Sequence, residues 1–316
     1  MMLMKKTPIK VAIISAMLAG LLGILPLVFA DKYLLNIVFL VGLYTILSQS
    51  WNILGGYCGQ ISLGHAAFFG LGALSARYLW SAGLPFFLAI PAGGLASAAL
   101  ACVIGVPALK LKSHYFAIGT LALAMIALIT IQNIFPGVDF LSPELLAGYS
   151  LVSRYYLVLL IAVATILATY AVVNSKMGIA LLSIREDEEA AEAIGIDTFK
   201  YKVICMLIST FIAGIAGGLF AVYSVSFYRY VPFELWWSFD PLLITFIGGA
   251  GTIAGPIIGA VCYVLLKELF ALSLGQVNVL IFGVVFILIV LFLPKGLIGL
   301  VERLRKLRKT DPIQLD

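Results

Sequence analysis

Gln60, Ser62 and His65 are the polar side chains of a short segment that separates two apolar stretches of the chain. An amide, a hydroxyl and an imidazole can each donate and accept hydrogen bonds. The segment, GGYCGQISLGH at residues 55–65, also has four glycines, each of which weakens a helix by about 1 kcal/mol relative to alanine. We predict a break that brings polar groups to a solute path, formed by Gly55, Gly56, Gly59, Gln60, Ser62, Gly64 and His65.

A second glycine-rich segment, GGAGTIAG at residues 248–255, lies in the other half of the chain. Paired glycine-interrupted hydrophobic segments in the two halves of a transporter point to its binding site. We therefore assign Gly248, Gly249 and Gly251 to the same path.

Two alternative interpretations remain open for these segments. GxxxG steps let helices pack closely without lining any path, and they occur at Gly251, Gly255 and Gly259 and at Gly214 and Gly218. For His65 the alternative is a structural histidine that hydrogen-bonds to neighbouring helices, because a buried polar group needs a partner.

Membrane-spanning helices must position these residues, because the composition excludes an ordinary soluble fold. Of 316 residues, 63% are hydrophobic and 11% are charged, against about 45–50% and about 25% in soluble domains. A span needs roughly 20 apolar residues. We expect an all-α, polytopic transmembrane helical bundle that forms a single permease domain, residues 1–316. The expected spans are 9–30, 33–54, 61–80, 84–106, 116–135, 155–173 and 201–225, followed by the apolar region 236–293.

The basic residues predict how the bundle is oriented, since lysine and arginine concentrate in cytoplasmic loops. With the N-terminus in the cytoplasm, the loop at about 174–200 and the basic tail at about 294–316 also fall there. Both termini then lie inside, which requires an even number of crossings. The region 236–293 should cross three times, with a break at 248–255, giving about ten crossings. The first run, 9–30, also resembles a signal peptide, but its length favours a retained span.

The loop at 174–200 contains SIREDEEAAEAIGID, residues 183–197. Ser183 and Glu186 match a capping box, and Gly195 is suited to end a helix. We predict one helix of about eleven residues, roughly 16 Å long. Its six acidic residues disfavour an anionic membrane surface, so we expect a protein partner.

EAAEAIG at residues 189–195 matches the EAA-x3-G signature of ABC importer permeases, although the proline that follows in the wider signature is absent. Further segments occur in the same order as in one branch of that family. These are GGYCGQISLGHAAFFGLGA, SHYFAIGTLALAMI, GIALLSIREDEEAAEAIGID, FIGGAGTIAGPIIGA and LFLPKGLIGL. From about residue 33 to 304 the chain closely resembles LivM-type permeases of bacterial branched-chain amino acid importers.

The resemblance implies a heteromeric importer in the bacterial cytoplasmic (inner) membrane. Its other members would be a second related permease, two cytosolic ABC ATPases and a periplasmic substrate-binding protein. This chain would bind no cofactor, metal or nucleic acid; it has no G-x-x-x-x-G-K-[ST] motif, so ATP and Mg²⁺ would be bound by the ATPases. Coupling to the ATPase would involve Arg185, Glu186, Glu189, Ala190, Ala191 and Gly195.

Other functions and substrates remain open at this point. Related importers carry urea, amides or other amino acids. An ion-coupled secondary transporter would usually carry ionisable residues inside its spans, whereas Asp240, Lys267 and Glu268 are expected near span ends. A membrane enzyme would need a catalytic constellation, which we do not find. The segment 223–237, YSVSFYRYVPFELWW, is expected either as an interfacial aromatic belt or as a docking surface that uses Arg229 and Glu234.

Overall fold

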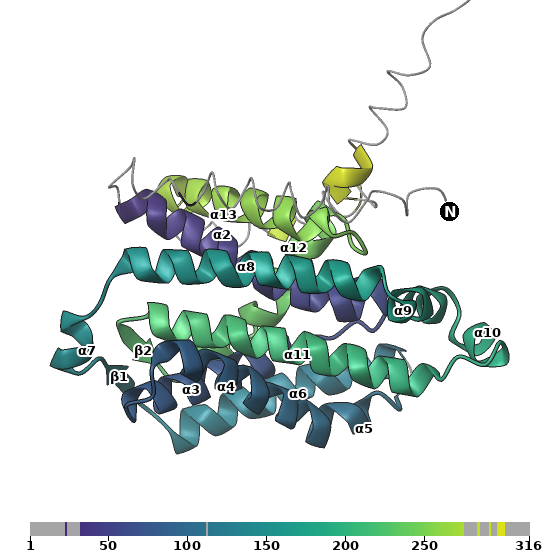
Figure 1. Ribbon diagram of the computed structural model, residues 1–316, viewed down its shortest axis with the longest axis horizontal. Coiled ribbons are helices and arrows are strands. Elements are labelled where there is room, and N and C mark those ends of the chain that lie inside the picture. Colours follow the sequence, from purple (N-terminus) through teal and green to yellow (C-terminus); the bar gives the residue numbers. More distant parts are fainter. Residues whose placement is uncertain are drawn as a thin grey trace, which may run out of the picture.

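The long helices of the protein run side by side along one direction (Figure 1). The computed structural model describes residues 23, 32–111, 113–274, 283–284, 291 and 296–300. One end of the bundle carries α9 (Lys176–Glu186) and α10 (Glu188–Ala193), and we call it the α10 end. The opposite end carries β1 (Val138–Phe140) and β2 (Ser226–Tyr228), and we call it the strand end.

Five helical segments among the described residues are long and apolar enough to cross a membrane. They correspond to α2 (Lys32–Trp51) continued by the π-helix η1 (Asn52–Tyr57), α4 (Phe86–Leu100) continued by η2 (Ala101–Gly105) and α5 (Val106–Ala108), α6 (Ser113–Ile134), α8 (Leu151–Val173) and α11 (Thr198–Tyr223). The expectation of a helical membrane bundle is confirmed. The total of ten crossings stays a prediction, since the expected span 9–30 and the last of the three crossings expected in the region 236–293 fall almost entirely outside the described residues.

Three further helices accompany these five: α3 (His65–Ser81), α12 (Trp236–Gly248) and α13 (Ala254–Leu274). The predicted break at 248–255 is confirmed, because α12 ends at Gly248 and α13 begins at Ala254. With 13 residues, α12 is about 20 Å long, shorter than the roughly 30 Å hydrocarbon core.

Glycines let the central helices approach until their backbones touch. A Cβ at Gly214 of α11 would overlap Ser97 of α4, and one at Gly217 would overlap the carbonyl of Phe69 in α3. Between α12 and α13, a Cβ at Gly259 would overlap the carbonyl of Ile244. Close packing of helices therefore explains Gly214 and Gly259, for which the sequence allowed either packing or a solute path.

The strand end is closed by irregular chain and short elements rather than by helices alone. Strands β1 and β2 pair antiparallel, with Asp139 opposite Phe227. The helix α7 (Pro143–Ala147) follows β1, and the 3-10 turn η3 (Val231–Phe233) follows β2. Arg77 of α3 is 1% exposed and donates four hydrogen bonds to carbonyls around these elements, which satisfies backbone groups that helices would otherwise pair.

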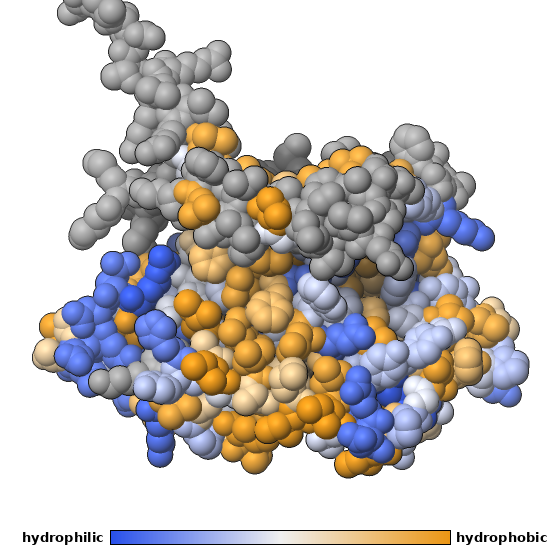
Figure 2. Space-filling view, turned by 180° about the vertical axis from the view of Figure 1, so that it is seen from behind, coloured by the Kyte–Doolittle hydropathy of each residue, from blue (hydrophilic) through white to orange (hydrophobic). Residues whose placement is uncertain are grey.

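The surface fits a lipid environment across the middle of the bundle. Figure 2 shows apolar residues across the middle of one face and hydrophilic residues gathered toward the α10 end. Exposed isoleucines and leucines on α6 and α8 contribute to the apolar surface, including Ile118, Ile126, Ile129, Leu160 and Leu167. The chain is a membrane protein, because so much exposed aliphatic surface is unfavourable in water.

Candidate functional site

The helix that leads into the first glycine-rich segment does not end at the first two glycines of that segment. Gly55 and Gly56 lie within the π-helix η1, which ends at Tyr57. Residues 58–64 are non-helical, and α3 begins at His65. At Gly59 the backbone has a φ of +76°, a conformation that suits glycine.

The polar side chains of this segment lie inside the protein. His65 is 0% exposed; its Nδ1 lies 3.3 Å from Ser62 Oγ and its Nε2 lies 3.1 Å from Ser209 Oγ. Ser209 of α11 also donates to the carbonyl of Ser50 in α2. The imidazole thus joins α2, α3 and α11 in one hydrogen-bonded network. Buried Gln60 has no partner for its Oε1 among the described residues.

The first turns of α3 and α12 meet inside the bundle. The backbone N–H of Ala66 donates to Ser238 Oγ at 2.8 Å, and the ring of Trp237 stacks on Phe69 with centroids 4.2 Å apart. From this junction α3 runs toward the strand end and α12 toward the α10 end (Figure 1). Each glycine-rich segment therefore adjoins a helix that begins within the bundle, the arrangement found around substrate sites of transporters with broken helices.

The two glycine-rich segments touch each other at the α10 end, although almost 200 residues separate them: a Cβ at Gly56 would lie 2.7 Å from the backbone nitrogen of Gly251. The Asn52 side chain donates to the Thr252 carbonyl at 2.9 Å and accepts from the Gly251 N–H at 2.8 Å. Gly251 has a φ of +74°. A Cβ at Gly248 would overlap the carbonyl of Gly255, so Gly248 and Gly255 hold α12 close to α13. The structure thus brings the residues of both predicted path segments together.

Arg185 connects α9 to this meeting point. Its Nη1 donates to the carbonyl of Gly56 at 2.6 Å. A Cβ added at Gly59 would lie 3.2 Å from Arg185 Cα, and one at Gly251 would overlap the guanidinium. The sequence predicted Arg185 as a coupling residue, but its contact with both glycine-rich segments was not foreseen.

The predicted helix of about eleven residues after Ser183 is wrong. The chain instead forms two helices, α9 ending at Glu186 and α10 beginning at Glu188. Ser183 lies within α9, where its hydroxyl donates to the Ile179 carbonyl, so it caps nothing. Asp187 has an extended backbone and accepts from the Ala190 N–H at 3.0 Å, because a short carboxylate is an equally good N-cap.

Gly195 ends α10 as predicted. Its φ is +87°, and the flanking N–H groups return to the helix: Gly195 donates to Glu192, and Ile196 donates to Ala191. These two bonds satisfy carbonyls that a helix C-terminus leaves unpaired.

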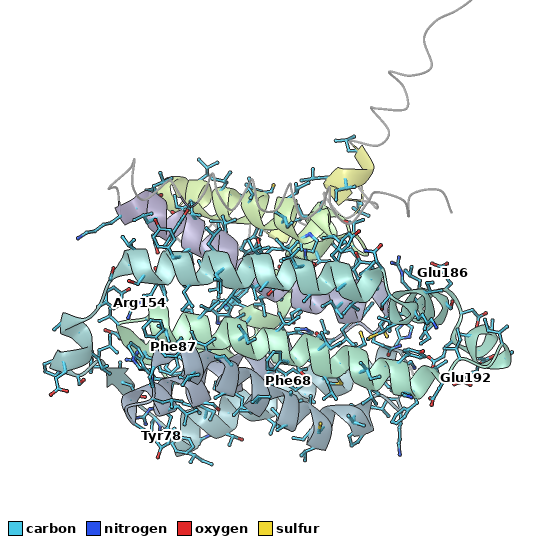
Figure 3. All side chains as sticks on the ribbon, viewed as in Figure 1. Phe68, Tyr78, Phe87, Arg154, Glu186 and Glu192 are labelled. Atoms are coloured by element: carbon cyan, nitrogen blue, oxygen red, sulfur yellow. The ribbon has the colours of Figure 1, made fainter. Side chains whose placement is uncertain are left out.

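The α10 helix presents one face outward and fixes the other to α11. Glu186 and Glu192 project at this end of the bundle (Figure 3), and Glu189 and Ala190 are exposed as well. Ala191 is 2% exposed, and Glu188 forms an ion pair with Lys202 of α11. Ile194 is 75% exposed; it was not singled out from the sequence, although a lone isoleucine among acidic residues was a usable signal.

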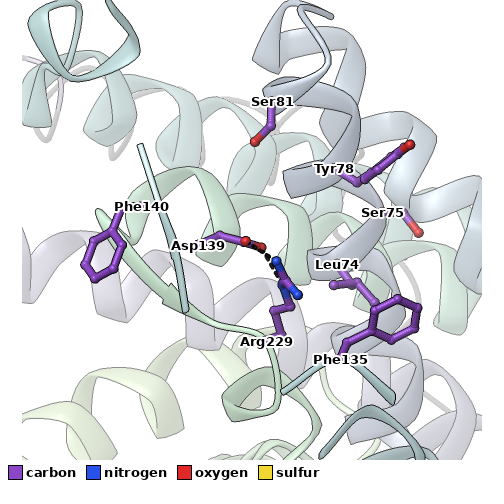
Figure 4. A pocket seen from close by; sticks show the side chains of 8 residues that line it. All are labelled: Leu74, Ser75, Tyr78, Ser81, Phe135, Asp139, Phe140 and Arg229. Carbon is purple, nitrogen blue, oxygen red and sulfur yellow. Dashed lines mark hydrogen bonds and ion pairs between the residues drawn. The ribbon is translucent and has the colours of Figure 1, made fainter. Parts of the chain in front are cut away.

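A cavity of about 630 Å³ opens at the strand end (Figure 4). Its lining includes Asp139 and Arg229, which form an ion pair with Nε 2.8 Å from Oδ2. The hydrogen bond from Arg229 lowers the pKa of the Asp139 carboxyl below its usual range. In the neighbouring aromatic segment, Trp236 is 53% exposed, whereas Trp237 is buried against Phe69, so the belt expected there is only partial.

Asp240 and Lys267, which were expected near span ends, form an ion pair between α12 and α13. Asp240 is 4% exposed and accepts from the Tyr44 hydroxyl, and Lys267 Nζ lies 3.8 Å from Asp240 Oδ2. Asp240 is the fifth residue of α12, and α13 continues seven residues beyond Lys267. In the part of the chain that the structure describes, no group of three His, Cys, Asp or Glu side chains is placed to hold a metal.

Comparison with known proteins identifies the family. Residues 33–292 match the family model described as branched-chain amino acid transport system / permease component. The high-affinity branched-chain amino acid transport system permease protein LivM of Salmonella typhimurium is 28% identical, over 86% of this chain and 72% of its own length. The LivM protein of Escherichia coli is 27% identical with the same coverage.

An archaeal relative shows the same similarity over a larger part of its own length. The probable branched-chain amino acid transport permease protein LivM of Methanocaldococcus jannaschii is 28% identical, over 81% of this chain and 90% of its own length. No solved structure matches the chain. The family match covers both glycine-rich segments, Arg185 and α10. The chain therefore belongs to the permease components of branched-chain amino acid transport systems.

Proposed function

We propose that this permease is one of two related transmembrane subunits of an ATP-binding cassette importer. The observation that carries the proposal is the hydrogen bond from Arg185 to the Gly56 carbonyl. It links the helix preceding the EAA motif to the first glycine-rich segment, and the same guanidinium packs against Gly251 of the second. Movement of α9 and α10 would therefore pull on the backbone of the proposed solute path without any intervening flexible loop.

The outer face of α10 is the proposed contact for a cytosolic ATPase. Glu189, Ala190, Glu192 and Ile194 are exposed there, while the ion pair between Glu188 and Lys202 fixes the helix to α11. The apolar side chains of Ala190 and Ile194, next to the carboxylates of Glu189 and Glu192, would suit a cleft that has an apolar floor and a basic rim. The ATPase subunits would bind ATP and Mg²⁺, and this chain would transmit the resulting motion.

The strand end is the proposed docking face for the periplasmic substrate-binding protein. This assignment places α10 and both chain termini on the cytoplasmic side of the inner membrane. The exposed residues of β1, β2 and α7 would meet the delivered binding protein, and the Asp139–Arg229 ion pair would shape the entrance beside its cavity. Arg229 is already ion-paired with Asp139. This supports a role in holding the entrance in shape more than a direct contact of Arg229 with the binding protein.

The proposed path runs from the strand end, past the junction of α3 and α12, to the glycine-rich segments at the α10 end. In this structure Gly56, Gln60, Ser62, Gly64 and His65 are buried. Opening would therefore require α3 and α12 to separate, with the glycine backbone acting as the moving element. The solute would be a branched-chain amino acid.

Reconstitution of the complete complex tests this function. With both permeases, both ATPases and loaded binding protein in proteoliposomes, leucine uptake should require ATP as well as the binding protein. Uptake driven by an ion gradient without ATP would support a secondary transporter instead. Inhibition of leucine uptake by excess valine or isoleucine, but not by urea, would support the amino acid substrate over the related urea importers.

A further inference from the structure

A charged cluster lies among α2, α12 and α13, outside the glycine-rich segments and beside the junction of α3 and α12, where Tyr44 stacks on Trp237 with ring centroids 5.8 Å apart. Lys267 Nζ donates to the Tyr44 hydroxyl at 3.2 Å and to the Tyr263 hydroxyl at 3.5 Å. The Tyr44 hydroxyl donates to Asp240 at 3.1 Å, and Lys267 stands 3.8 Å from the same carboxylate oxygen. Four ionisable groups from three helices thus converge on one point.

This cluster lies deep within the membrane-spanning part of the chain. Tyr44 is at the midpoint of the span Lys32–Tyr57. Asp240 lies eight residues before the end of α12 at Gly248, a distance of about 12 Å along the helix. Ionisable residues at such depth are costly and almost always face a bundle interior or a water-filled cavity, where they mark substrate and ion pathways.

The two charges of the cluster differ sharply in exposure. The side chain of Asp240 is 5% exposed, whereas that of Lys267 is 55% exposed. An exposed stripe of α13 is apolar and consists of Ile258, Val261, Leu265 and Leu269. Lys267 does not belong to that stripe. It lies on the same side of the helix as Tyr263 and Ala260, which come four and seven residues earlier and are both buried. Its ammonium is therefore accessible from the seam between helices, not from the apolar stripe.

Among the described residues, Lys267 makes fewer hydrogen bonds than its ammonium allows. An ammonium has three N–H donors, and its two tyrosine contacts are with neutral hydroxyls. The Asp240 oxygen nearest to Lys267 already accepts from Tyr44, and at 3.8 Å it is beyond hydrogen-bond distance. In the part of the chain that the structure describes, the third donor of the ammonium faces only the Asp240 carboxylate at 3.8 Å, so an anion that approaches through the seam can take its place as hydrogen-bond acceptor.

We propose that Lys267 binds the carboxylate of the transported amino acid near the middle of the membrane. This inference rests on the proposed function, and it names the group that recognises the substrate. Aliphatic amino acids share one carboxylate and differ in their side chains, so a single cation on the path serves all of them. Tyr44 and Tyr263 position the ammonium, and Asp240 is a positioning residue that stabilises it when the site is empty.

Chemical replacement of the ammonium tests the proposal in the complete reconstituted complex. The reference complex has Cys58, Cys102, Cys205 and Cys262 replaced, and it must first be shown to transport leucine in the presence of ATP. If it does not, the result counts against the proposed function of the permease and does not test the role of Lys267. Lys267→Cys should raise KM for loaded binding protein or lower uptake by about tenfold to a hundredfold, the range for losing one hydrogen bond to a charged group.

Thiol reagents then distinguish the effect of the charge at position 267 from the effect of the side-chain volume there. Aminoethyl methanethiosulfonate converts the cysteine at 267 to a lysine-like side chain and should restore most of the uptake. Sulfonatoethyl methanethiosulfonate adds the opposite charge at similar size and should not. Loaded binding protein with ATP should slow labelling at 267. Leu265→Cys, on the exposed apolar stripe of the same helix, should show neither rescue nor substrate protection.

Conservative substitutions guard against loss of folding. Lys267→Arg should assemble and retain uptake, whereas Lys267→Met should assemble, keep basal ATPase activity and lose uptake. Normal leucine uptake by Lys267→Met would overturn the proposal. It would also be overturned if the cysteine at 267 resists both reagents and instead cross-links to the second permease, since the residue would then be a subunit contact.

Discussion

The side chain of Arg185 joins α9 to the first glycine-rich segment. Its guanidinium donates to the Gly56 carbonyl at 2.6 Å while its backbone belongs to the last turn of α9. We expect Arg185→Ala to leave the complex assembled but to lower the leucine transported per ATP hydrolysed several-fold, because a charge-assisted hydrogen bond contributes about 1.5–3 kcal/mol. Uptake and ATPase rates measured on the same proteoliposomes give this ratio.

The matched control for that change is Lys176→Ala. Lys176 is an exposed cation at the start of the same helix. Lys176→Ala removes one positive charge from α9, as Arg185→Ala does, but it changes no contact with either glycine-rich segment. An equal loss of coupling in both variants would show that net charge, and not the contact with Gly56, is responsible.

The Asp139–Arg229 ion pair gives a prediction about pH. Since Arg229 holds the pKa of Asp139 low, the stabilisation is present above the unfolded carboxyl pKa of about 3.9 and is lost as pH falls through the lower folded value. Both side chains are 30% exposed, so we expect Asp139→Asn to cost less than about 1 kcal/mol at pH 7.

Thermal unfolding of the purified complex at pH 7, 5 and 3.5 measures this difference. The gap between wild type and Asp139→Asn should persist at pH 5 and shrink at pH 3.5. Glu144→Gln, an exposed carboxylate on α7 at the same end, is the control and should show no gap. A gap for Asp139→Asn that is as large at pH 3.5 as at pH 7 would contradict the ion-pair explanation.

At the scale of elements, α10 separates exposed residues from residues that hold the fold. Ala190 and Ala193 are exposed, whereas Ala191 is 2% exposed. We expect Ala193→Arg to weaken co-purification of the ATPase subunits while leaving the permease folded. Ala191→Arg should destabilise the permease itself, because a guanidinium cannot be buried there without a partner.

Ala147→Arg supplies the control for this prediction. Ala147 is exposed on α7 at the opposite end of the bundle, where no ATPase contact is proposed. The idea that α10 is the ATPase contact fails if Ala193→Arg binds the ATPase normally, or if Ala147→Arg weakens binding as much.

The non-helical chain between η1 and α3 gives a second prediction at this scale. Gly59 and Gly83 both have positive φ values, +76° and +98°, but only Gly59 lies against Arg185, and nothing is near Gly83. We expect both Gly→Ala changes to cost about 1–2 kcal/mol of backbone strain. Only Gly59→Ala should also lower leucine uptake, with assembly and basal ATPase activity preserved. Loss of uptake in both variants would assign the effect to general instability.

At the scale of the whole molecule, the two ends of the bundle should face opposite sides of the membrane. With native cysteines replaced, Glu189→Cys on α10 and Lys306→Cys in the basic tail should be labelled only after membranes are opened. Phe140→Cys on β1, 71% exposed, should be labelled by an impermeant reagent on right-side-out spheroplasts. Labelling of position 306 on the same intact spheroplasts would exclude the ten-crossing arrangement.

The sequence by itself determined the class of this protein, most helix positions and the family. A continuous excess of apolar residues leaves few alternatives to transmembrane helices, and the breaks at residues 58–64 and 249–253 were visible as glycine clusters. Gly195 was recognisable because ending a helix with positive φ is a local requirement. The single helix predicted after Ser183 failed because Ser183 and Asp187 are both good caps, and sequence alone does not rank them.

Only the tertiary structure decided which residues meet. The contact of Gly56 with Gly251, the approach of Arg185 to both, and the cluster of Tyr44, Asp240 and Lys267 join positions far apart in the chain. Such contacts depend on where helices begin and how closely glycines let them pack. Because α12 begins within the bundle, Asp240 is buried against Tyr44 of α2, a contact that the hydropathy of the chain does not reveal.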